Sequence, residues 1–211
     1  MGKQVNDILK KICTELGYVE KRDKYIGNIY MKSVSTNIYS TICFNIASYQ
    51  IKGHRLIAPI IGVIYSDVES LLRRVSKFDP RKYSNTIDEH IGYIMPVHDW
   101  TEWDLIEPGT NSEVVLNDLK SALLKYSIIY YERFSNIENV IAKAEDMPWG
   151  PAYYSLLVRL PIMYYLAGRK RSGERFINRA FEKGYNEVDK LFTDEYISNY
   201  MSLPDNHLDA K

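Results

Sequence analysis

The residues with the greatest potential for chemistry lie in the segment IGYIMPVHDWTEW, from Ile91 to Trp103. His98, Asp99 and the nearby Asp104 could supply a general base, an orienting carboxylate and a second acid, because histidine titrates near neutral pH. Their spacing is not a known catalytic motif. The chain has no HExxH metal motif, no GxSxG nucleophile motif and no glycine-rich phosphate loop. We therefore assign no catalytic residue, no metal ligand and no cofactor.

Two other roles for this segment do not involve catalysis. The favoured one is packing: Trp100 and Trp103 would fill the space between a sheet and its helices, while His98 and Asp99 stay solvated. The functional alternative is a binding surface, because tryptophans on loops are over-represented among the residues that dominate binding energy. Its residues would be His98, Asp99, Trp100 and Trp103.

A second group of residues is basic. Arg171, Arg175 and Arg179 recur every four residues, and like charges at this spacing destabilise a helix by about 0.2–0.5 kcal/mol per pair. The favoured explanation is internal neutralisation by carboxylates, namely Glu174, Glu182, Asp189, Asp194 or Glu195. The functional alternative is a stripe that docks an acidic partner or a phosphate, because guanidinium groups bind both bidentately.

The overall composition argues against several partners. The 211-residue chain has 27 basic and 27 acidic side chains, so it lacks the net field that draws a protein to nucleic acid or to anionic lipid. Cys13 and Cys43 form no CxxC pair, which predicts buried free thiols rather than a zinc or redox site. The N-terminus lacks the apolar core of a secretory signal, and no apolar segment is long enough to cross a bilayer. We expect a cytoplasmic protein that does not associate with membranes.

The first half of the chain alternates between helical and strand patterns. Apolar residues at helical spacing predict a first helix from Val5 to Leu16, with Gly17 in the left-handed conformation at its end. Period-two patterns and β-branched runs then predict strands, and Ser66 and Glu69 have capping-box spacing at the start of a second helix. The expected strands are 25–34 and 38–49, which form a hairpin, 56–65 with Pro59 at an edge or a bulge, and 90–95.

The second half shows helical patterns only. Capping-box spacings at Thr110–Glu113 and Ser135–Glu138 predict two helix starts, and a last helix is expected over about 187–201. Between them, residues 152–184 resemble one tetratricopeptide unit, a hairpin of two helices. The positions that carry this resemblance are Leu157, Pro161, Tyr164, Gly168, Gly173 and Ala180.

These elements predict an α+β fold, in which an antiparallel sheet of about four strands with flanking helices precedes an all-helical half. The α+β half covers 1–107, the helical half 108–203 and a disordered tail 204–211. The two halves are either separate domains or one continuous domain.

The order of motifs resembles a family of bacterial cytosolic domains of unknown function. The matching motifs are LGY at the end of the first helix, IIGVIYSDVESLL, and IGYIMP followed by tryptophans. The resemblance covers most of the chain, but these are packing motifs, so it implies a fold and no catalytic residue. It also implies an immunity-type role in a bacterial toxin locus.

The leading functional hypothesis is a non-enzymatic protein that binds a protein partner, such as a toxin. A neutral chain does not suit an inhibitor that mimics nucleic acid, so a nuclease is disfavoured as that partner. One alternative is a small hydrolase-type enzyme that uses His98 and Asp99 with His54 or His90 brought near by the fold. A further alternative, a single-stranded nucleic-acid binder, requires the aromatic residues and the arginines to share one groove.

Overall fold

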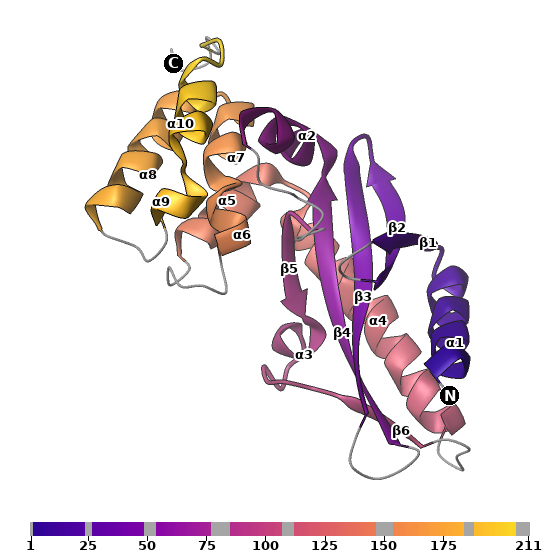
Figure 1. Cartoon of the computed structure of the whole chain (residues 1–211). Helices are drawn as coiled ribbons and strands as arrows, with labels where there is room; N and C mark the ends of the chain where they lie inside the picture. Colours follow the sequence, from indigo (N-terminus) through magenta and orange to yellow (C-terminus); the bar gives the residue numbers. More distant parts are fainter. Residues whose placement is uncertain are drawn as a thin grey trace. The chain divides into compact units, whose positions relative to one another are not determined.

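A computed structural model describes residues 2–23, 27–48, 54–76, 85–106, 112–146, 154–183 and 188–205. An antiparallel sheet with helices forms the N-terminal half and the C-terminal half is mostly helical, which confirms the predicted α+β class (Figure 1). The chain forms two compact units. Unit 1 comprises Met1–Ile64 and Ile87–Arg133, and unit 2 comprises Tyr65–Thr86 and Phe134–Lys211. The domain boundary expected at residue 107 stays a prediction.

The strands are β1 (Val19–Asp23), β2 (Gly27–Ser35), β3 (Ile38–Ser48), β4 (His54–Tyr65), β5 (Ile87–His90) and β6 (Trp103–Ile106). The helices are α1 (Gly2–Glu15), α2 (Ser66–Val75), α3 (Ile91–Ile94), α4 (Ser112–Phe134), α5 (Ile137–Glu145), α6 (Tyr154–Leu157), α7 (Leu160–Leu166), α8 (Lys170–Glu182), α9 (Val188–Leu191) and α10 (Asp194–Met201).

The sheet has the strand order β1-β2-β3-β4-β5, and β6 also pairs with β4. The predicted hairpin is present: β2 and β3 are antiparallel, with Ile29 opposite Cys43. The described residues contain six strands rather than about four. The sequence of β1, VEKRD, is too charged to show a strand pattern, and β6 is only four residues long.

The sequence predicts that Pro59 lies either on an edge strand or at a bulge. Its strand, β4, is not an edge strand, because it lies between β3 and β5. β6 pairs with His54–Ile57, and β5 pairs with Ile60–Val63. Pro59 falls between these two paired segments, so neither strand needs the backbone N–H that proline lacks.

The first helix ends as predicted, and its end positions the following chain. Gly17 has φ +84°. The N–H of Gly17 donates to Thr14 O and the N–H of Tyr18 donates to Cys13 O, each at 2.9 Å, which is the Schellman arrangement. This turn directs the Tyr18 side chain into the core of unit 1, where its hydroxyl lies 2.8 Å from Ser40 Oγ.

Helices α1 and α4 cover part of the sheet within unit 1 (Figure 1). Lys120 Nζ of α4 forms an ion pair with Glu15 Oε2 at 2.5 Å. The core contains apolar side chains from the strands and from both helices, including Leu9, Ile42, Ile57, Ile61, Leu105, Leu119 and Leu123.

The strand expected at 90–95 is wrong. The strand β5 ends at His90, and the next four residues form the helical turn α3. The N–H of Gly92 donates to His90 Nδ1 at 3.3 Å, and the N–H of Met95 donates to Ile91 O at 3.1 Å. Gly92 also lies against the carbonyl of Asp99, where a side chain would clash. Local capping and close packing therefore override the β-like composition of this segment.

The capping box expected at Ser66 and Glu69 is also wrong, because Glu69 forms a buried ion pair. In unit 2, Arg159 Nε donates to Glu69 Oε1 at 2.7 Å and Arg159 Nη2 donates to Oε2 at 2.8 Å. Thr86 Oγ1 donates to Glu69 Oε1 at 2.7 Å and accepts the N–H of Tyr65 at 3.0 Å. Thr86 thus accepts the backbone N–H of Tyr65, the N-cap residue of α2, and the helix has no side-chain cap of its own.

Helices α7 and α8 of unit 2 form a helical hairpin within the predicted range, residues 152–184. Gly168 has φ +76° in the connection between them. Gly173 of α8 lies against the hydroxyl of Tyr200, which donates to the carbonyls of Pro161 and Lys170 at 3.0 and 3.1 Å. The likeness of this hairpin to a tetratricopeptide unit stays a prediction.

The C-terminal end of α10 is bound to the start of α8 by a buried lysine. Lys170 Nζ donates to the carbonyls of Met201 and Leu203 at 3.0 and 2.5 Å, and it lies 3.2 Å from Asp205 Oδ1. A cation that neutralises the carbonyl end of a helix is favourable.

Three smaller expectations have separate outcomes. The last helix is divided into α9 and α10, because Thr193 caps a new helix through a 3.2 Å bond from the N–H of Tyr196. The cap of α5 is Asn136 rather than Ser135. Thr110 and residues 206–211 of the expected tail lie outside the described residues.

Removing one partner of the buried ion pair should destabilise unit 2 strongly. We expect Arg159→Met to lower the free energy of unfolding by about 3–5 kcal/mol, because it leaves the Glu69 carboxylate buried without a counterion. The double variant Glu69→Leu/Arg159→Met should recover much of that loss. Urea unfolding of the variants tests this, and a double variant that loses the sum of the two single effects would contradict it.

Gly173→Ala should destabilise the protein although alanine is the better helix former. A methyl group at this position meets the Tyr200 hydroxyl, and overpacking costs about 1–3 kcal/mol. Tyr200→Phe removes the clashing oxygen, so in thermal unfolding the double variant should lose less than the two single variants together. Equal or greater stability of Gly173→Ala would show that no close approach exists.

Candidate functional site

The structure gives different environments to the two tryptophans of the predicted binding segment. Trp103 lies in β6 and is 5% exposed, and its Nε1–H donates to Asp118 Oδ2 of α4 at 2.8 Å. Trp100 lies in the loop after α3 and is 49% exposed. Trp103 therefore has the packing role, and Trp100 is the tryptophan that can reach a partner.

Trp100 is held rigidly in its exposed position. Its ring stacks on the imidazole of His90, with the ring centroids 3.9 Å apart and the planes 9° from parallel. Its backbone N–H donates to Asp99 Oδ1 at 2.7 Å. The backbone of His98, at φ +48°, makes the turn that leads into this position.

Exposed side chains near Trp100 extend the surface. Tyr93 is 38% exposed and Val97 is 63% exposed. The Tyr93 ring contacts both histidine rings edge-on, at 5.9 Å from His90 and 6.0 Å from His98, and His98 Nδ1 lies 2.7 Å from the Tyr93 carbonyl. We call Tyr93, Val97, His98 and Trp100 the aromatic platform.

His90 lies under the platform in an unusual electrostatic setting. It is buried, its Nδ1 accepts the N–H of Gly92, and its Nε2 has no partner among the described residues. An accepting Nδ1 places the proton on Nε2 in the neutral ring. Burial lowers the pKa of His90, an effect opposed by the weaker attraction of Glu102. His90 is therefore neutral near pH 7.

The side chains named by the enzyme hypothesis lie in two places: His90 is brought near His98 and Asp99, with the Tyr93 ring in contact with both imidazoles, whereas His54 lies where β4 pairs with β6. Within the described ranges, the His98 and Asp99 side chains do not hydrogen-bond to each other, since each bonds to a nearby backbone group. His54 instead meets Asp104, with Nδ1 and Oδ2 2.9 Å apart, where β4 pairs with β6. The two residues are fifty positions apart in the sequence, and no motif links them.

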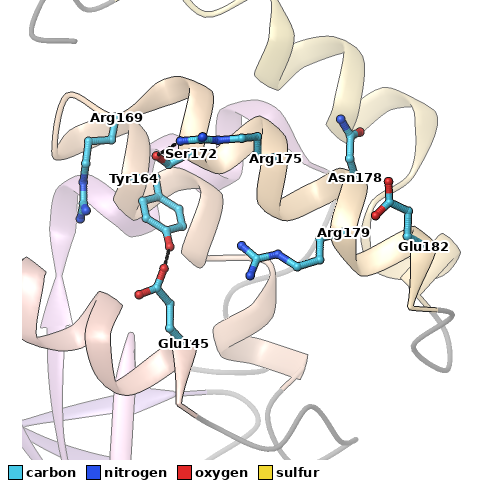
Figure 2. A pocket seen from close by; sticks show the side chains of 8 residues that line it. All are labelled: Glu145, Tyr164, Arg169, Ser172, Arg175, Asn178, Arg179 and Glu182. Carbon is cyan, nitrogen blue, oxygen red and sulfur yellow. Dashed lines mark hydrogen bonds between the residues drawn. The ribbon is translucent and has the colours of Figure 1, made fainter. Parts of the chain in front are cut away.

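Two arginines of α8, Arg175 and Arg179, line an open pocket in unit 2, with a volume of about 550 Å³ (Figure 2). We call it the arginine pocket. The residues that line it are Glu145, Tyr164, Arg169, Ser172, Arg175, Asn178, Arg179 and Glu182. Arg171, the first residue of the predicted stripe, is exposed and does not line it.

The expected neutralisation of the arginines by Glu174, Glu182, Asp194 or Glu195 does not occur through ion pairs of the described side chains, and the side chain of Asp189 lies outside them. None of Arg171, Arg175 and Arg179 forms an ion pair with a described side chain. Arg175 Nη2 donates to Ser172 Oγ at 3.2 Å. The adjacent Arg169 is paired with Glu138 and lies over the Tyr164 ring, 5.1 Å from its centroid.

Glu145 and Tyr164 form the opposite wall of the pocket. The Tyr164 hydroxyl donates to Glu145 Oε1, and Figure 2 shows Arg179 pointing towards the space beside this pair. Sequence reasoning missed both residues. They come from α5 and α7; Tyr164 is only a packing position of the tetratricopeptide-like pattern, and Glu145 belongs to no motif.

Other chemistry has little support in the described residues. No three His, Cys, Asp or Glu side chains there are grouped closely enough to hold a metal ion. Cys13 and Cys43 are buried free cysteines, as predicted, and burial raises the pKa of the Cys13 thiol. The helices within these ranges include none with the length and hydropathy needed to span a bilayer.

Searches with protein-family models, against curated proteins and against solved structures find no match to this chain. The family resemblance drawn from the packing motifs therefore stays a prediction.

Acidification should destabilise the protein through His90. Histidine in an unfolded chain has a pKa of about 6.5, and the folded value is lower, so the folded state binds fewer protons. Below about pH 6.5 the free energy of unfolding therefore falls as the pH falls. His90→Gln, which cannot gain this proton, should lose less stability between about pH 7.5 and 5.5. An NMR titration that gives His90 a pKa of 6.5 or more would contradict the burial effect.

Proposed function

We propose that this protein is a non-enzymatic interaction protein that binds a protein partner through the aromatic platform. The observation that carries the proposal is the half-exposed Trp100 ring, stacked on buried His90. The resemblance to immunity-type domains favours a toxin as the partner.

The platform has the physical properties of a binding hot spot. Tryptophan and tyrosine supply a large contact area with few rotatable bonds, so little conformational entropy is lost when they are covered. The stacking on His90 and the bonds of Asp99 and His98 already fix the ring positions. A surface ordered before binding avoids part of the cost of association.

The chemistry of the platform also indicates the kind of contact. Tyr93, Val97 and Trp100 present mainly apolar surface, and His98 adds a polar edge. The partner should therefore contribute an apolar side chain or a shallow apolar pocket that covers the indole. The net charge of the chain is zero, so long-range attraction contributes little to recognition.

Affinity purification of the tagged protein from its native cells, followed by mass spectrometry, tests the proposal. We expect one stoichiometric partner, and we expect Trp100→Ala to weaken its binding by about thirtyfold, the cost of a hot-spot side chain worth about 2 kcal/mol. Leu124→Ala is the matched control, because Leu124 is 52% exposed and lies on α4, outside the platform.

Two results would refute this function. One is recovery of no stoichiometric partner under gentle conditions. The other is a partner that binds the Trp100→Ala variant as tightly as the Leu124→Ala variant.

A further inference from the structure

We propose that the arginine pocket of unit 2 binds an organic phosphate, a small molecule with a phosphate at one end and hydrogen-bond donors at the other. A sugar phosphate or a nucleoside monophosphate belongs to this class. The site lies in the other unit from the aromatic platform, so the inference does not rest on the proposed protein partner.

The phosphate end is assigned to Arg175 and Arg179. The two guanidinium groups come from successive turns of α8 and form no ion pair with any carboxylate among the described residues. Each guanidinium has five N–H donors, and a dianion between them removes the repulsion between like charges at four-residue spacing. Neither guanidinium is neutralised by an ion pair within the described part of unit 2, although the carboxylates of Glu145 and Glu182 also line the pocket.

Further donors favour a phosphate over a carboxylate. Ser172 Oγ accepts a hydrogen bond from Arg175, so its own O–H remains available for a ligand. Asn178 adds an amide to the same pocket. Ser172, Asn178 and the two guanidinium groups together offer more hydrogen-bond donors than the two oxygens of a carboxylate can use. A phosphate monoester has three terminal oxygens and can accept more of these hydrogen bonds.

The opposite wall is suited to a different part of the ligand. Tyr164 donates to Oε1 of Glu145, which leaves Oε2 as an acceptor (Figure 2). This carboxylate repels a bare phosphate but accepts hydrogen bonds from hydroxyl or amino groups. A ligand with a phosphate near Arg175 and Arg179 and a hydroxyl near Glu145 satisfies both walls at once.

The dimensions of the pocket agree with such a ligand. Its volume of about 550 Å³ falls in the range of about 300–1,000 Å³ that is usual for small-molecule sites. Both binding arginines are exposed, so salt should screen the attraction. Binding should therefore weaken as the ionic strength rises.

Calorimetric titration of the full chain with three probes tests the proposal. The probes are ribose 5-phosphate, ribose, which lacks the phosphate, and inorganic phosphate, which lacks the sugar. We expect ribose 5-phosphate to bind most tightly, inorganic phosphate to bind about tenfold more weakly, and ribose not to bind.

Single variants distinguish the roles of the two walls. Arg175→Gln and Arg179→Gln should each weaken ribose 5-phosphate about tenfold or more, since each loses charge-assisted hydrogen bonds. Arg171→Gln makes the same charge change on the same helix outside the pocket and should bind as the wild type does. Glu145→Gln should weaken ribose 5-phosphate without weakening inorganic phosphate. Thermal unfolding checks that every variant remains folded.

Three results would overturn the proposal. These are no binding of either phosphate, equal weakening by Arg171→Gln and Arg175→Gln, and inorganic phosphate that binds as tightly as the sugar phosphate. The last result would mean that the site reads only a phosphoryl group, such as one on a modified protein. None of them bears on the partner of the aromatic platform.

Discussion

The pairing of Glu69 with Arg159 is the interaction on which unit 2 depends. It joins α2 to the segment between α6 and α7, ninety residues later in the chain. Thr86 extends the same network to the backbone of Tyr65, and the Tyr65 hydroxyl donates to Phe134 O at 2.6 Å. Burying two charges is costly, and an apolar pair of similar size can be as stable. What the pair adds is a fixed geometry, because its two parallel hydrogen bonds permit one alignment of the two segments.

That geometry extends to the arginine pocket. Arg159 stands directly before α7, which carries Tyr164, and α7 packs on α8, which carries Arg175 and Arg179. The absence of a side chain at Gly173 allows Tyr200 to bond to the backbones of both α7 and α8. The exposed cations therefore project from a rigid support, which limits the entropy lost when a ligand is bound.

The sequence predicted those parts of the fold that depend on local patterns. The helical spacing before Gly17, the hairpin of β2 and β3 and the helical hairpin of α7 and α8 follow from periodicity and glycine positions. The failures have a common physical cause. Glu69 has the spacing of a capping residue but binds a distant arginine, and Gly92 lies in a segment of strand-like composition but packs against Asp99. Partners outside the local pattern decide both cases, and periodicity does not report them.

The candidate sites show the same division. Composition drew equal attention to Trp100 and Trp103, but only Trp103 is buried, and its indole N–H donates to Asp118 in another element. The four-residue spacing suggested one stripe of arginines, whereas the pocket takes Arg175 and Arg179 without Arg171. Its other wall, from Glu145 and Tyr164, depends on how α5 and α7 approach α8 in three dimensions.

Lys170 has a consequence for how this protein can be handled. Lys170 is the first residue of α8, the helix that carries the arginines. Its ammonium group donates to the carbonyls of Met201 and Leu203. A C-terminal truncation that removes Met201 and Leu203 would leave the buried Lys170 ammonium without these two acceptors. It would therefore disturb the start of α8, about thirty residues earlier in the chain.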